Sequence, residues 1–291
     1  MNNHKKALLL YLIIVFVISA VIETVWIIFG ETAAKSGISS VLMFVPFFAA
    51  LIVGKILLNK QNSLGFRISK FTYVFCAIII PIIYLGGSYG LYWLFNKSSF
   101  VGNLSVLIEY ASAYNQELPN NLAIIISLVV TVFITFITAF GEEVGWRGFM
   151  YPIMHKLWGW KKAIIISGGI WALWHLPLVI SGVYLPGTIL AYRIPAFVIE
   201  VFALTVIITW LRMKSNSVWP AIVFHAAHNY FDQIILQSLT NNPKSVYFVG
   251  ETGFITIIFT VIVAVIILIR EKNVFMESNF CENKQKIIKN N

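Results

Sequence analysis

The chain has 291 residues, of which 59% are apolar and 11% are charged, and its formal net charge is +9. Its apolar residues come in blocks of about twenty, without the alternation of a surface helix or strand, which excludes an ordinary soluble domain. The predicted fold class is therefore all-α, in the form of a polytopic membrane protein, because helices satisfy their own backbone hydrogen bonds inside hydrocarbon.

Eight apolar runs are long enough to cross a bilayer, and the fourth is unusually long. In chain order they cover about residues 7–29, 39–58, 71–95, 121–154, 162–181, 193–211, 217–236 and 252–269. Between the third and fourth runs, residues 103–118 are mixed in polarity and predict an outer interfacial helix or loop. We divide the chain into N-terminal transmembrane helices (1–120), a core that holds every motif below (121–236), and a last transmembrane helix with a cytoplasmic tail (237–291).

The distribution of basic residues predicts the orientation of these spans. With the N-terminus in the cytoplasm, all but four of the 21 lysines and arginines fall in cytoplasmic segments, as the positive-inside rule requires. The four exceptions are Lys35, Lys97, Arg193 and Lys244. The sequence thus predicts a multi-pass protein of the cell membrane with both termini in the cytoplasm. Because topology explains the net charge, no nucleic-acid partner is expected.

Three charges lie inside the long fourth run, in the stretch GEEVGWRGFM. A carboxylate in hydrocarbon costs a few kcal/mol or more, so it is rare unless it is paired, faces a cavity or is functional. Glu143 and Arg147 are four residues apart and can neutralise each other as an ordinary ion pair on one helix face. Glu142 points about 100° away around the helix and is predicted to remain unpaired, as a general base would.

His175 is predicted to lie level with Glu142. A turn at KLWGWKK, residues 156–162, would fold the chain into an antiparallel hairpin in which both residues lie about equally far from the turn. Small residues on the two arms would allow a close approach, although they are also ordinary packing residues. They are Gly141, Gly145, Gly148, Ser167, Gly168, Gly169 and Ala172. A lone histidine could equally bond a neighbouring helix.

His225 and Asn229 form a third polar cluster, in FHAAHNYFD. They are four residues apart and share one helix face, and Asn229 is predicted to lie level with the first two clusters. An imidazole and an amide can donate hydrogen bonds to a developing oxyanion, or they can simply pack between helices. His228 falls on another face, and no catalytic role is expected for it.

In combination, these motifs resemble the CAAX protease and bacteriocin-processing (CPBP, or Abi) family of intramembrane glutamate proteases. The matching motifs, in order on successive helices, are Glu142-Glu143-x-x-x-Arg147, an aromatic-x-x-x-His that ends at His175, and His225-x-x-x-Asn229. The resemblance spans about residues 121–236. It departs from the family pattern at Trp171, where phenylalanine is more common.

The resemblance implies an intramembrane endopeptidase that hydrolyses a peptide bond of a membrane-associated or lipidated peptide or protein. By position, it implies that Glu142 and His175 activate a water molecule and that His225 and Asn229 hold the oxyanion. Glu143 and Arg147 would brace the site. Eukaryotic relatives cut after a prenylated cysteine, and bacterial ones are linked to bacteriocin immunity or peptide-signal maturation. Neither the natural substrate nor the oligomeric state is predicted.

Metal-free catalysis is favoured, so no cofactor is expected. Zinc held by Glu142, His175 and His225 stays open as an alternative, because imidazole and carboxylate are zinc ligands. Against zinc, the chain has no His-Glu-x-x-His helix of the metalloprotease kind.

Two other classes of protein remain in competition. A non-catalytic immunity or scaffold protein of the same fold would bind a peptide or a partner membrane protein. A transporter or proton pathway would use intramembrane acids, here Glu23, Glu142, Glu200 and Asp232. Glu23 and Glu200 favour a transporter, since neither has an obvious local partner. The sequence shows neither the paired broken helices nor the half-to-half symmetry that is common in transporters.

Overall fold

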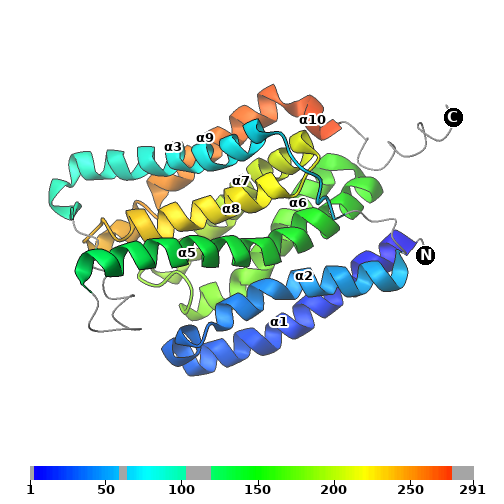
Figure 1. Cartoon of the computed structure of the whole chain (residues 1–291), viewed down its shortest axis with the longest axis horizontal. Coiled ribbons are helices and arrows are strands. Elements are labelled where there is room, and N and C mark those ends of the chain that lie inside the picture. Colours follow the sequence, from blue (N-terminus) through cyan, green and yellow to red (C-terminus); the bar gives the residue numbers. More distant parts are fainter. Residues whose placement is uncertain (1–2, 59–63, 103–118, 277–291) are drawn as a thin grey trace.

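The computed structural model describes residues 3–58, 64–102 and 119–276, and every regular element in those ranges is helical (Figure 1). The all-α prediction is therefore confirmed. The interfacial segment predicted at 103–118 and the end of the predicted cytoplasmic tail, from residue 277 onward, lie outside the described residues.

The long helices follow the predicted apolar runs closely. They are α1 (Asn3–Lys35), α2 (Ile38–Leu57), α3 (Phe71–Phe95), α5 (Asn120–Glu143), α6 (Tyr151–Ser181), α7 (Leu190–Ser215), α8 (Trp219–Asn229) and α9 (Phe254–Arg270). Two π-helical segments, η2 (Val144–Met150) and η3 (Tyr230–Leu236), continue α5 and α8. The shorter elements are η1 (Lys97–Ser99), η4 (Pro243–Tyr247) and α10 (Lys272–Met276).

Five helical runs within the described ranges are long and apolar enough to cross a membrane. One of them, Asn121–Ser181, is 61 residues long and contains both the fourth and the fifth predicted spans. The chain is therefore a multi-pass membrane protein by length and composition, while the count of eight crossings stays a prediction. The start of α1 and α10 lie toward the same end of the molecule (Figure 1), and the side of the membrane that this end faces also stays a prediction.

The helices pack in a closed order. Beginning from α1, each contacts the next in the series α1, α2, α5, α8, α3, α9, α7 and α6, and α6 contacts α1 again. In Figure 1, α1 and α2 form a pair on one side, α3 and α9 lie on the other, and the remaining helices lie between them. Contacts between α7 and α8 run across this arrangement. The three sequence motifs are thus carried by helices that pack in the middle of the bundle.

Gly159 makes the predicted turn at KLWGWKK. Its backbone angles are φ 75° and ψ 168°, a conformation that glycine adopts without the steric cost of a Cβ atom. On the two arms of the hairpin, the rings of Trp146 and Trp174 pack edge to face with their centroids 5.6 Å apart. The predicted antiparallel hairpin is therefore present.

The small residues of this hairpin do not face each other as predicted. A Cβ atom on Gly145 would lie 2.4 Å from the Cβ of Pro46, so this glycine faces α2. On the other arm, a Cβ atom on Gly168 would lie 3.0 Å from the ring of Phe202, on α7. The prediction was wrong because a sequence shows which residues are small and does not show which neighbour occupies the space they leave.

Replacing Gly145 with alanine is expected to destabilise the protein by about 1–3 kcal/mol, the usual cost of overpacking a well-packed site. The added methyl group would overlap both the side chain and the backbone of Pro46, so α2 would have to move. Gly86→Ala in α3 is the matched control, because nothing lies within 4 Å of its added Cβ. Thermal unfolding in detergent compares the two variants, and equal melting temperatures would contradict the close contact with α2.

Candidate active site

A cavity of about 480 Å³ is lined by residues of α1, α2, α5, α6, α7, α8 and η3, together with the loops before α7 and α9. All four residues predicted to be catalytic line it, namely Glu142, His175, His225 and Asn229. They come from three separate parts of the chain, and the fold brings them to one hollow. The predicted support residues, Glu143 and Arg147, are not part of its lining.

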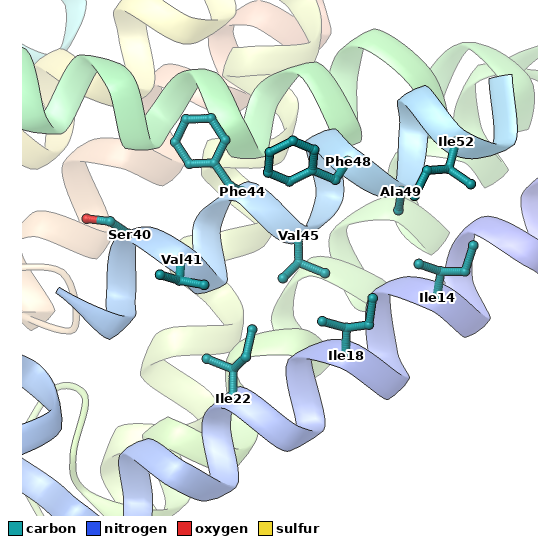
Figure 2. Close-up of a pocket in the computed structure, with 10 residues that line it drawn as sticks. All are labelled: Ile14, Ile18, Ile22, Ser40, Val41, Phe44, Val45, Phe48, Ala49 and Ile52. Carbon is teal, nitrogen blue, oxygen red and sulfur yellow. The ribbon is translucent and has the colours of Figure 1, made fainter. Parts of the chain in front are cut away.

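A second hollow, of about 450 Å³, lies between α1 and α2 (Figure 2). Its lining is apolar apart from Ser40, which also lines the larger cavity. No titratable side chain is among its lining residues. This hollow therefore offers no acid or base, and the cavity at Glu142 is the candidate active site.

Glu142 is held by two tryptophans. Only 1% of its surface is exposed, and its Oε2 accepts hydrogen bonds from the indole nitrogens of Trp171 at 2.9 Å and Trp146 at 3.2 Å. No ion pair within the described ranges includes Glu142. Within the described part of the chain, the carboxylate that was predicted to be unpaired therefore has no counter-ion, but it does have hydrogen-bond partners. The hydrogen bonds from the two indoles lower the free-energy cost of burying the Glu142 carboxylate.

Glu143 lies at the centre of a buried charge network. Its Oε1 accepts from Arg147 Nη1 at 2.9 Å, as the spacing of four residues predicted, and is also 2.9 Å from Nδ1 of His225. The guanidinium of Arg147 stacks over the ring of Trp171, with its carbon 4.2 Å from the ring centroid. The link from Glu143 to His225 was not predicted. It ties the support residues directly to the cavity wall.

The ring of His175 is fixed by its own helix and by aromatic neighbours. Its Nδ1 is 3.0 Å from the carbonyl oxygen of Trp171, and a carbonyl can only accept, so Nδ1 carries the proton. The ring packs edge to face on Trp174, with centroids 4.6 Å apart, and stacks on Tyr184. In the neutral ring this leaves Nε2 as a proton acceptor.

One π-helical segment begins within the first motif, between Glu143 and Arg147, and the other begins directly after the third motif. Segment η2 starts at Val144, next to Glu143, and η3 starts at Tyr230, next to Asn229. Single π-helical turns are rare in proteins, and those that occur are often at functional sites. The wider turn shifts the direction of the side chains that follow. Nothing in the sequence pattern predicted either segment.

Other polar residues of the cavity wall were not among the predicted site residues, and they include His228, Gln233 and Glu251. Gln233 could have been found, since it continues the four-residue spacing of His225 and Asn229 on the same helix face. His228 was assigned to another face, yet it lines the cavity. Its Nδ1 is hydrogen-bonded to the hydroxyl of Tyr84, and its Nε2 has no partner within the described part of the chain.

The acids of the transporter alternative do not all line this cavity. Of that set only Glu142 lines the cavity, whereas Glu23, Glu200 and Asp232 do not. Asp232 is buried and accepts a hydrogen bond from the hydroxyl of Tyr89 at 2.8 Å. This hydrogen bond joins η3 to α3.

The arrangement of metal-ligating side chains bears on the zinc alternative. Among the residues that the structure describes, no group of three or more His, Cys, Asp or Glu side chains is placed to hold a metal ion. The trio Glu142, His175 and His225 is thus not gathered as a zinc site here. Metal-free chemistry itself stays a prediction.

Comparison with known proteins shows that this chain is similar to CAAX prenyl endopeptidases. Residues 124–231 match the family model described as type II CAAX prenyl endopeptidase Rce1-like. The CAAX prenyl protease 2 of Methanococcus maripaludis is 23% identical over 286 residues, covering 95% of this chain and 98% of the relative. The predicted resemblance to the CAAX protease family is therefore confirmed. The matched region contains all six predicted site residues.

Proposed function

We propose that the chain is an intramembrane endopeptidase that hydrolyses a peptide bond of a membrane-associated or lipidated peptide or protein. The observation that carries this proposal is the convergence of Glu142, His175, His225 and Asn229 on one cavity. Its similarity to CAAX prenyl endopeptidases supports the same reaction type.

In the first step, Glu142 is the general base. Both indole donors use Oε2, which leaves Oε1 to accept a hydrogen bond from a water molecule in the cavity. His175 offers Nε2 to the same water, so the two residues orient it toward the scissile carbonyl. As the water oxygen attacks the carbonyl carbon, its proton passes to Glu142.

In the tetrahedral intermediate, His225 and Asn229 stabilise the negative oxygen. Glu143 accepts the Nδ1 proton of His225, and a carboxylate in that place also stabilises the ring in its charged form. The charged ring can donate from Nε2, and the amide of Asn229 can donate beside it. The proton held by Glu142 then passes to the leaving nitrogen, the C–N bond breaks, and a carboxylic acid and an amine are released.

Cleavage of membrane-inserted peptides by the purified protein in bilayers tests the proposal. Products from a peptide library, identified by mass spectrometry, should form equally well with and without a strong chelator. Loss of cleavage under the chelator, restored by zinc, would replace metal-free catalysis with the zinc alternative. If no peptide is cleaved under any condition, the non-catalytic binding protein becomes the better account.

Trp171→Phe is expected to slow cleavage about tenfold, because it removes one hydrogen bond to the Glu142 carboxylate while keeping an aromatic ring under Arg147. Trp93→Phe is the matched control, since it removes an indole hydrogen bond to Thr240 at a site that does not line the cavity. Initial cleavage rates at saturating peptide measure the effect. Equal rates for the two variants would show that the indole does not assist the base.

A further inference from the structure

We propose that Glu251 binds a cationic group of the substrate, an amine or a guanidinium, within about four residues of the bond that is cut. This inference rests on the proposed function, because it assigns a specificity to the same cavity. Neither the family motifs nor the predicted site residues include Glu251.

The carboxyl group of Glu251 is built into the cavity wall. The residue precedes α9, lines the cavity and is only 7% exposed. The hydroxyl of Tyr184 donates a hydrogen bond to Oε2, and the amide of Gln233 donates one to Oε1. Each carboxylate oxygen can accept more than one hydrogen bond, so this pair of donors holds the group in place and leaves acceptor capacity for a ligand.

The charge of the lining favours a cation. The two acids of the lining are Glu142 and Glu251, and no lysine or arginine is among the lining residues. Glu143 has Arg147 as its counter-ion, but no ion pair within the described ranges includes Glu251. A largely desolvated carboxylate gains most from an opposite charge that brings its own hydrogen-bond donors. The same cavity would disfavour a carboxylate near Glu251.

The spacing between His225 and Gln233 along α8 and η3 indicates how far from the cleaved bond the cationic group would bind. Gln233, which bonds Glu251, follows His225 by eight residues, or at most about 12 Å at the α-helical rise per residue. That length corresponds to three or four residues of extended chain. His228 lies between them in sequence and lines the cavity, with Nε2 lacking a partner within the described part of the chain. A substrate backbone lying from the catalytic pair toward Glu251 would meet this nitrogen.

Binding to an inactive protein tests this assignment independently of cleavage. The Glu142→Gln protein in bilayer discs is titrated with a set of fluorescent apolar peptides, each carrying one lysine at a successive position, and with partners in which norleucine replaces that lysine. Acetylated and free N-termini separate a side-chain amine from a terminal one. At one position we expect the cationic peptide to bind at least about tenfold more tightly, the order of a charge-assisted hydrogen bond.

A second substitution identifies the residue responsible. Adding Glu251→Gln should bring the two affinities at that position to within about twofold, while adding Glu271→Gln should leave their ratio unchanged. Glu271 is a suitable control because it pairs with Lys214 and does not line the cavity. The inference is overturned if no position prefers a cation, if the preference survives Glu251→Gln, or if that substitution weakens both peptides equally. If one position prefers the cationic peptide and Glu251→Gln removes that preference, but the wild-type protein cleaves no peptide, then the proposed function is overturned and the inference on Glu251 stands.

Discussion

Glu142→Gln is expected to reduce the cleavage rate by about 10²- to 10⁴-fold, the contribution of a positioned general base. Glutamine has the same shape and can still accept hydrogen bonds from Trp146 and Trp171, but it cannot take a proton from water. The effect should therefore fall on the chemical step, with little change in peptide affinity. Single-turnover cleavage and equilibrium binding, measured on the same preparation, separate the two.

Glu271→Gln is the matched control for that measurement. It makes the same chemical change in the exposed ion pair with Lys214, outside the cavity. Its cleavage rate should stay within twofold of the wild type. A Glu142→Gln protein that is folded and cuts at the wild-type rate would remove the general base from the account.

Glu143→Gln is expected to have the largest effect on stability, a loss of about 3–5 kcal/mol in the free energy of unfolding. The substitution leaves the buried guanidinium of Arg147 without its counter-ion and takes the carboxylate from His225. Cleavage should fall as well, both through unfolding and through the weaker support of His225. Thermal unfolding in detergent and the rate per folded molecule measure the two losses.

The double variant Glu143→Gln/Arg147→Met separates support of the fold from support of the site. Removing both members of a buried ion pair is often nearly neutral for stability, so most of the melting temperature should return. Cleavage should stay at least about tenfold below the wild type, because His225 still lacks the carboxylate that stabilises its charged form. Full recovery of cleavage together with stability would restrict Glu143 to a structural role.

The helices could be predicted from the sequence because each apolar run has the length that a span requires. The predicted run 71–95 coincides with α3, and the run 162–181 ends where α6 ends. The turn at Gly159 was also predictable, because charged residues and tryptophans interrupt the apolar sequence there. These are local properties of the chain, and hydropathy reports them directly.

The convergence of the site was partly predictable. Counting residues from the turn placed Glu142 and His175 at one depth, and both line the cavity. The partners of these groups were not predictable, because they depend on how helices rotate and which neighbours they meet. The indole of Trp171 reaches Glu142 across the hairpin, and His225 reaches Glu143 from α8. Glu251 comes from a loop whose position no periodicity describes.

The measurement that tests the central claim most directly is cleavage in ¹⁸O-labelled water. Wild-type protein and Glu142→Gln are incubated in bilayers with a membrane peptide and a chelator, and the products are analysed by mass spectrometry. We expect the wild type to form a new C-terminal carboxyl group that carries one oxygen from the labelled water, and the variant to form almost none. Absence of that product from the wild type, or its formation by Glu142→Gln at the same rate, would contradict hydrolysis by water activated at Glu142.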